Sequence, residues 1–107
     1  MMIVTTTPDF PGREVLEVIG IVRGNTIRAR HVGKDITAFV KNLVGGEIQE
    51  YTKLLAESRE QALDRMREEA EKLGADAVIS MRFVTANVTQ GASELLAYGT
   101  AVKLKQL

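Results

Sequence analysis

The chain has 107 residues, of which 45% are hydrophobic, with 14 basic and 14 acidic side chains, one histidine and no cysteine. This length fits a single domain over residues 1–107. Without cysteine there are no disulfides, thiolate metal sites or cysteine nucleophiles, and one histidine excludes a multi-histidine metal site within a subunit. The net charge of zero argues against nucleic-acid and membrane-surface partners, which both select for a basic excess.

Residues 1–8 lack the basic and apolar segments of a signal peptide, and no apolar run approaches the length of a membrane span. We therefore expect a cytoplasmic protein. A domain of this size buries only roughly 60 to 65% of the surface of its unfolded chain. With no disulfide to compensate for a small core, self-association is expected.

The first half of the chain predicts two strands and a short helix. Residues 2–6 are β-prone and end at a turn over Pro8–Gly12. Residues 14–22 are almost all apolar or β-branched, which indicates a strand buried on both faces, with Gly20 as a candidate bulge or point of close approach. Gly24-Asn25 predicts a turn or bend into a short extension over residues 26–30. Apolar residues at helical spacing predict a short helix over 36–44.

The second half predicts a long helix and a hairpin. The helix begins at Glu47, after a pair of glycines, and ends near Leu73, with Gly74 as its left-handed cap. Alternating residues over 77–84 indicate a third strand, and a turn at 90–93 leads to a fourth over 94–105. The predicted fold is α+β: an antiparallel sheet of about four strands on one long and one short helix, in the order β-β-α-α-β-β. The second and fourth strands look apolar on both faces, so we expect the far face of the sheet to meet another subunit.

Several short motifs follow one another at a particular spacing over nearly the whole chain. They are Gly45-Gly46-Glu47, Tyr51-Thr52, Leu54-Leu55, Arg59, Ala62, Met66, Gly74-Ala75-Asp76-Ala77-Val78-Ile79 and Ala97-Tyr98-Gly99-Thr100-Ala101-Val102. Together they resemble the YbjQ-like family of small proteins, whose pattern has Asn at the position of Asp76. The resemblance implies a dodecin-like subunit, a ring that is most simply a homopentamer, and a label of heavy-metal binding.

The segment from Arg23 to Lys41 is basic and leads into the predicted short helix. Arg28, Arg30, His31 and Lys34 are therefore candidate ligands for a phosphate or carboxylate, with a solvated basic surface as the simpler interpretation. The same cations around His31 disfavour a divalent ion there. A metal would otherwise need carboxylates, or side chains from several subunits around an axis.

We find no pattern typical of a catalytic site. Ser58 and Ser80 have no suitably placed base, since the chain has one histidine. Tyr98 and Glu94 are four residues apart on one strand, so they share a face, but packing and hairpin-end roles explain them more simply. The residues favour no enzyme activity, and no cofactor is indicated.

Arg59 falls near the centre of the apolar stripe of the predicted long helix. The stripe consists of Ile48, Tyr51, Leu55, Ala62, Leu63, Met66, Ala70 and Leu73. A buried guanidinium needs a carboxylate, from the sheet or from a neighbouring subunit, and Glu94 and Glu17 are the leading candidates. Alternatively, Arg59 extends past the stripe into water.

Two functions remain in view. One is a ring-forming scaffold or small-ligand binding module with copies of itself as its partner. The other is a metal-ion-binding protein that uses carboxylates or His31 at subunit interfaces.

Overall fold

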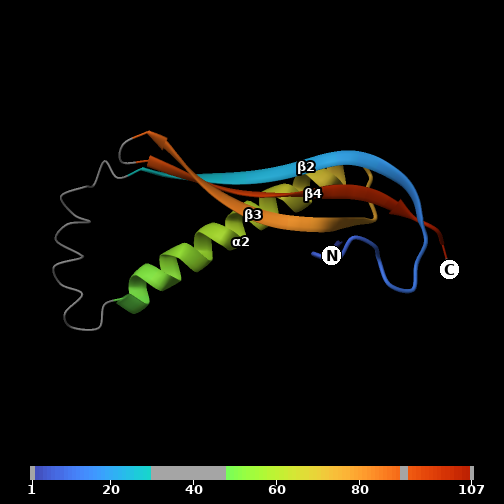
Figure 1. The fold of residues 1–107 in the computed structure, drawn as a ribbon, viewed down its shortest axis with the longest axis horizontal. Coiled ribbons are helices and arrows are strands. Elements are labelled where there is room, and N and C mark those ends of the chain that lie inside the picture. The colour runs from blue at the N-terminus through green and yellow to red at the C-terminus, as the bar shows by residue number, and fades with distance from the viewer. Residues whose placement is uncertain (1, 30–47, 90–91, 107) are drawn as a thin grey trace.

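The computed structural model describes residues 2–29, 48–89 and 92–106. In these residues one long helix, α2 (Ile48–Lys72), lies across one face of a four-stranded sheet (Figure 1). The strands are β1 (Ile3–Val4), β2 (Val15–Ala29), β3 (Ala77–Thr89) and β4 (Ala92–Leu104). Their order in the sheet is β1-β3-β4-β2, which makes β3 and β4 the inner strands.

The α+β class is confirmed, but the described elements follow the order β-β-α-β-β rather than β-β-α-α-β-β. The predicted short helix, 36–44, lies outside the described residues. The prediction of an antiparallel sheet was also wrong in part, because β1 pairs with β3 in parallel, with Ile3 opposite Ala77. Strands β2 and β3 both pair with β4 antiparallel.

The turn predicted at Gly24-Asn25 is wrong, because β2 continues through both residues. Glycine is needed at this position for a different reason: the backbone of α2 comes very close. A Cβ on Gly24 would lie 2.2 Å from the carbonyl oxygen of Ala62 and 2.3 Å from the backbone nitrogen of Met66. The predicted bulge at Gly20 is confirmed by a register shift between Val18 and Gly20.

The end of α2 follows the prediction closely. Gly74 has a positive φ of 77°, the left-handed conformation that caps helices. Its N–H donates to the carbonyl of Glu71 at 3.0 Å, and the N–H of Ala75 donates to the carbonyl of Ala70 at 3.1 Å. These two bonds form a Schellman motif and satisfy carbonyls that the helix end leaves unpaired.

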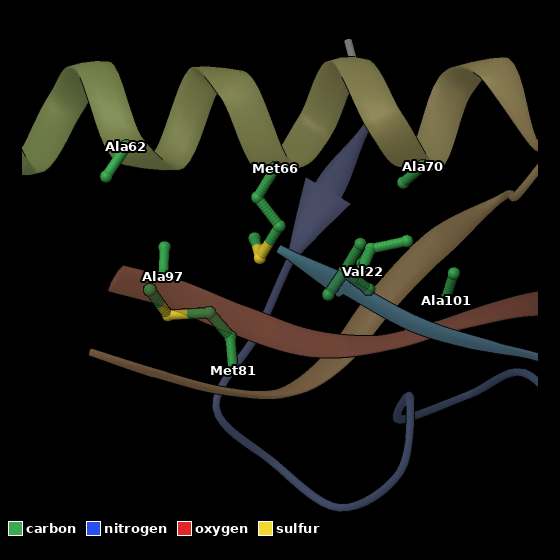
Figure 2. Close-up of a cluster of buried hydrophobic side chains, with 8 residues drawn as sticks. Val22, Ala62, Met66, Ala70, Met81, Ala97 and Ala101 are labelled. Carbon is green, nitrogen blue, oxygen red and sulfur yellow. The ribbon is translucent and has the colours of Figure 1, made fainter. Parts of the chain in front are cut away.

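The main core lies between α2 and the sheet (Figure 2). Its buried members are Val22, Ala62, Met66, Ala70, Val78, Met81, Ala97 and Ala101. Most of these side chains are small, which allows helix and sheet to approach closely, and Met66 fills the space between them. A second cluster, of Ala77, Ile79, Val102 and Leu104, is packed against Phe10 and Val15.

The described helix, α2, is not long and apolar enough to cross a membrane.

Candidate functional site

The most unusual surface of the described chain is the face of the sheet that turns away from α2. We call it the open face. Side chains alternate along each strand, and directly paired residues of antiparallel strands share a face. The open face comprises Val18, Ile21, Arg23, Asn25 and Ile27 of β2, Arg82 and Val84 of β3, and Glu94, Leu96 and Tyr98 of β4.

Large apolar side chains on the open face are exposed. On β2 the exposed fractions are 63% for Val18, 65% for Ile21 and 60% for Ile27. Val84 and Tyr98 continue the apolar surface across the other two strands. An antiparallel sheet with one solvated face normally alternates apolar and polar residues, and exposed apolar side chains of this size are typical of an interaction surface.

A row of charge crosses the open face at its centre. Tyr98 lies opposite Arg23 on one side and Arg82 on the other. Arg82 is anchored, because its NH1 group donates to the carbonyls of Thr6 at 2.9 Å and Met81 at 2.8 Å. Arg23 is exposed and forms no ion pair with any described residue. The row is therefore cationic and leaves one guanidinium available to a partner.

Near the hairpin that joins β3 and β4, Glu94 makes the open face polar. The side-chain amide of Asn25 donates to Oε2 of Glu94 at 2.9 Å, while NH1 of Arg65 on α2 donates to the backbone carbonyl of Asn25. Glu94 and Tyr98 do share a face, as their spacing predicts. The carboxylate of Glu94 therefore accepts a hydrogen bond from the amide of Asn25 on the open face.

Arg59 is exposed within the subunit, so it is not part of the buried line of α2, while the alternative interpretation had it extend past the stripe into water. The buried line on α2 runs through Ser58, Ala62, Met66 and Ala70, one position away. Helix α2 crosses the sheet obliquely and its N-terminal half extends away from the strands (Figure 1), which leaves Leu55 42% exposed as well. Arg59 lies beside this buried line, and its side chain is exposed.

The predicted partners of Arg59 are also out of its reach within the subunit. Glu94 is on the open face, with the sheet between it and α2. Glu17 pairs with Lys103, seven residues along β2 from the point where Gly24 meets α2. Between the described residues, Arg59 forms no ion pair with either carboxylate. A pair with a neighbouring subunit stays a prediction.

The candidate ligand-binding residues cannot be assembled into a site here. Arg28 lies near the end of β2, opposite Ser93, while Arg30, His31 and Lys34 lie outside the described residues. The anion-binding hypothesis therefore stays a prediction. In the described part of the chain, no three histidine, aspartate or glutamate side chains come together in a way that could hold a metal ion.

Sequence reasoning missed two features that bear on the open face. The first is the continuity of β2, which keeps Ile27 in the same strand as Ile21. The second is the length of β3, which runs five residues past the predicted end at Val84. The β-branched residues Thr85, Val88 and Thr89 were the available signal for the second feature.

These features define a small α+β protein whose sheet exposes apolar side chains, among them Val18, Ile21 and Ile27, on the face turned away from α2. A family described as "Putative heavy-metal-binding" matches residues 2–105, and the chain belongs to this YbjQ-like family. Family membership, as predicted from the motifs, is thereby confirmed.

Relatives match the chain end to end. A UPF0145 protein of Archaeoglobus fulgidus is 61% identical over 104 residues, which cover 97% of this chain and 96% of the relative. A UPF0145 protein of Thermotoga maritima is 54% identical over 106 residues, covering 99% and 100%. A solved structure of a DUF74 family protein from Pediococcus pentosaceus aligns with a TM-score of 0.63 at 17% identity, covering 97% of this chain and 98% of that one. This last likeness supports the fold alone.

Proposed function

We propose that the protein is a homo-oligomeric scaffold, or small-ligand binding module, that assembles through the open face. The exposed apolar residues Val18, Ile21 and Ile27, the last two on either side of Arg23 and Asn25, are the observation that carries the proposal. Burying such a side chain completely is worth about 1.5–3 kcal/mol. Because Val18, Ile21 and Ile27 are each at least 60% exposed, burial in a contact between copies would gain most of this stabilisation for each of them. The same residues of the second copy would gain it as well.

The family supplies the form of the proposed assembly. The resemblance implies a dodecin-like subunit in a closed ring, most simply a homopentamer. A ring repeats every open face around one axis, so the cationic row at Arg23 would recur in each subunit. That repetition would suit an anionic small ligand held between copies, with Arg28, Arg30, His31 and Lys34 as further candidates.

The second candidate is metal binding, which the description of the family favours. The described residues contribute no complete set of ligands within one subunit. A metal site would therefore be built between subunits, from carboxylates or His31. The number of bound ions would then be fixed for each ring rather than for each subunit. Native mass spectrometry of the purified protein measures both the subunit number and any copurified ion or organic molecule.

A single charge on the open face tests the assembly. In Ile21→Lys, association would bury an ammonium group without a partner, so we expect a particle of 11.7 kDa by light scattering. Leu73→Lys is the matched control, because Leu73 is 48% exposed but lies at the end of α2, and this variant should keep the wild-type mass. Circular dichroism checks that both variants fold. An Ile21→Lys particle of unchanged mass would contradict assembly through the open face.

A further inference from the structure

Two arginines flank one tyrosine on the open face. Tyr98 of β4 lies directly opposite Arg23 of β2 and directly opposite Arg82 of β3. Neighbouring strands are about 4.8 Å apart, so the backbones of the two arginines are about 10 Å apart, with the tyrosine between them. Each guanidinium is therefore one strand away from the phenol group, and all three side chains are within reach of one small ligand.

Irregularities in the two strands beside β4 put these arginines on the open face. Along a regular strand, residues an odd number of positions apart lie on opposite faces. Ile79 and Arg82 are three positions apart, yet both lie on the side turned away from α2, because the register shifts between them. Val18 and Arg23 are five positions apart, and a register shift between Val18 and Gly20 has the same effect. Without these bulges the two arginines would face α2.

The bulge in β3 contains a strained residue. Ser80 has a φ of 54°, and among the described residues it is the one non-glycine residue with a positive φ. This conformation is uncommon for residues other than glycine. The N–H of Ser80 donates to the carbonyl of Thr7 at 2.9 Å, next to the Thr6 carbonyl that accepts from Arg82. The same N-terminal segment thus holds both the bulge and the arginine, and maintained strain of this kind is typical of functional sites.

The charge of the two arginines is not neutralised by any described carboxylate. Neither Arg23 nor Arg82 forms an ion pair with a described residue. Arg82 uses its NH1 group for backbone carbonyls, and its Nε and NH2 groups form no hydrogen bond within the described chain. The hydroxyl of Tyr98, which is 39% exposed, also forms none there. Glu94 is four residues along β4, about 13 Å away, and accepts from Asn25. The three side chains therefore have donors and positive charge available to an anion.

We propose that Arg23, Tyr98 and Arg82 bind the phosphate group of a small phosphate monoester. This inference rests on the ligand-binding part of the proposed function and names the chemical class of the ligand. Guanidinium groups form paired hydrogen bonds to phosphate oxygens, and the phenol adds a further donor. A phosphate monoester carries close to two negative charges at neutral pH, which matches two guanidinium groups. A carboxylate carries one charge and would leave one arginine uncompensated.

The surroundings of the three side chains favour an apolar group on the phosphate. Ile21, Val84 and Leu96 are neighbours of the three side chains along β2, β3 and β4, and they belong to the same open face. Ile21 is 65% exposed and Val84 is 45% exposed. A hydrocarbon or aromatic group attached to the phosphate would remove part of this apolar surface from water. We therefore expect an alkyl or aryl phosphate to bind more tightly than inorganic phosphate.

Calorimetric titration of the full-length protein with phenyl phosphate tests the site. We expect saturable binding of one molecule per subunit. Arg23→Met removes a charge and Tyr98→Phe removes one hydroxyl, and each should weaken binding by about tenfold or more, because hydrogen bonds to charged groups are the strong ones. Arg59→Met is the matched control, since Arg59 is exposed on α2 and forms no ion pair with a described residue. This variant should keep the wild-type affinity.

Benzoate is the comparison ligand, because it has the same ring and a single negative charge. It should bind by about tenfold or more weakly than phenyl phosphate, and equal affinities would overturn the choice of a phosphate. An absence of phenyl phosphate binding, or an affinity unchanged in Arg23→Met and Tyr98→Phe, would overturn the site. If light scattering shows that the same sample is oligomeric, the proposed assembly stands without it. Binding that depends on Arg23 in a monomeric wild-type protein would support the site and overturn the assembly.

Discussion

Gly24 allows a strong test of the packing, because its neighbours are backbone atoms. In Gly24→Ala the new Cβ would lie 2.2 Å from the Ala62 oxygen, 2.3 Å from the Met66 nitrogen and 2.8 Å from the Arg65 carbonyl carbon, where ordinary contact begins at 3.4 Å. Helix α2 would have to move back from β2 by about 1 Å, which opens the close-packed core. Alanine gains about 0.5–1 kcal/mol in backbone entropy over glycine within a strand. Overpacking outweighs this gain, and we expect a net loss of about 3 kcal/mol.

Gly99 provides the comparison, because its nearest neighbour is a side chain. A Cβ there would lie 2.6 Å from Cγ1 of Val78 and 3.1 Å from the carbonyl oxygen of Ile79. Gly99→Ala should cost about 1–3 kcal/mol. Adding Val78→Ala removes the closest atom, so the double variant should be more stable than additivity predicts by about 1 kcal/mol. Adding Ala62→Gly to Gly24→Ala removes none of the backbone atoms that the new Cβ would meet. The losses of unfolding free energy from Gly24→Ala and from Ala62→Gly should therefore be additive.

Urea unfolding followed by circular dichroism gives the free energies of unfolding. All variants are compared at one protein concentration, because the stability of an oligomer depends on it. A Gly24→Ala variant within about 0.5 kcal/mol of wild type would refute the close approach of α2 and β2. Rescue by Ala62→Gly would refute the assignment of the conflict to backbone atoms.

Three further outcomes are expected. Gly74→Ala should lower the free energy of unfolding by about 1 kcal/mol in the same assay because of its positive φ, and Gly74→Asn should lose less, since asparagine tolerates that conformation. Arg59→Met and Glu94→Ala should each change the free energy of unfolding by no more than about 0.5 kcal/mol in a monomeric Ile21→Lys background, because the two side chains are on opposite sides of the sheet. A strongly non-additive effect of the two substitutions in that background would show that Arg59 and Glu94 form a pair within one subunit. Calorimetric titration with Zn(II) and Cu(I) should show no submicromolar site at one ion per subunit, because the chain has no cysteine and one histidine; tight binding at that stoichiometry would contradict the sequence argument.

Local signals in the sequence predicted the elements that depend on neighbours along the chain. The end of α2 was found because Gly74 follows the last apolar residue of a helical pattern, and the β3–β4 hairpin because two alternating runs follow each other closely. The apolar character of β2 predicted burial on both faces, whereas within the subunit Val18 and Ile21 are exposed, and contact of that face with another subunit stays a prediction. These features follow from composition and periodicity alone.

Features that depend on residues distant in sequence were not predictable in this way. Gly24 resembles a turn residue, and only the approach of Ala62 and Met66 explains a glycine within a strand. Arg59 fits the helical stripe, but the buried line passes through Ser58 instead, because the crossing of α2 over the sheet decides which side of the helix is covered, and periodicity does not predict that crossing. Strand β1 has just two residues, and its parallel pairing with β3 is fixed by the tertiary fold.

The mass of the wild-type particle tests self-assembly most directly. Sedimentation equilibrium of the full-length protein over micromolar concentrations should give a single species at an integral multiple of 11.7 kDa, and the resemblance to the family implies a multiple of five. A particle of 11.7 kDa throughout that range would show that Val18, Ile21 and Ile27 stay in water, and it would contradict the proposed assembly.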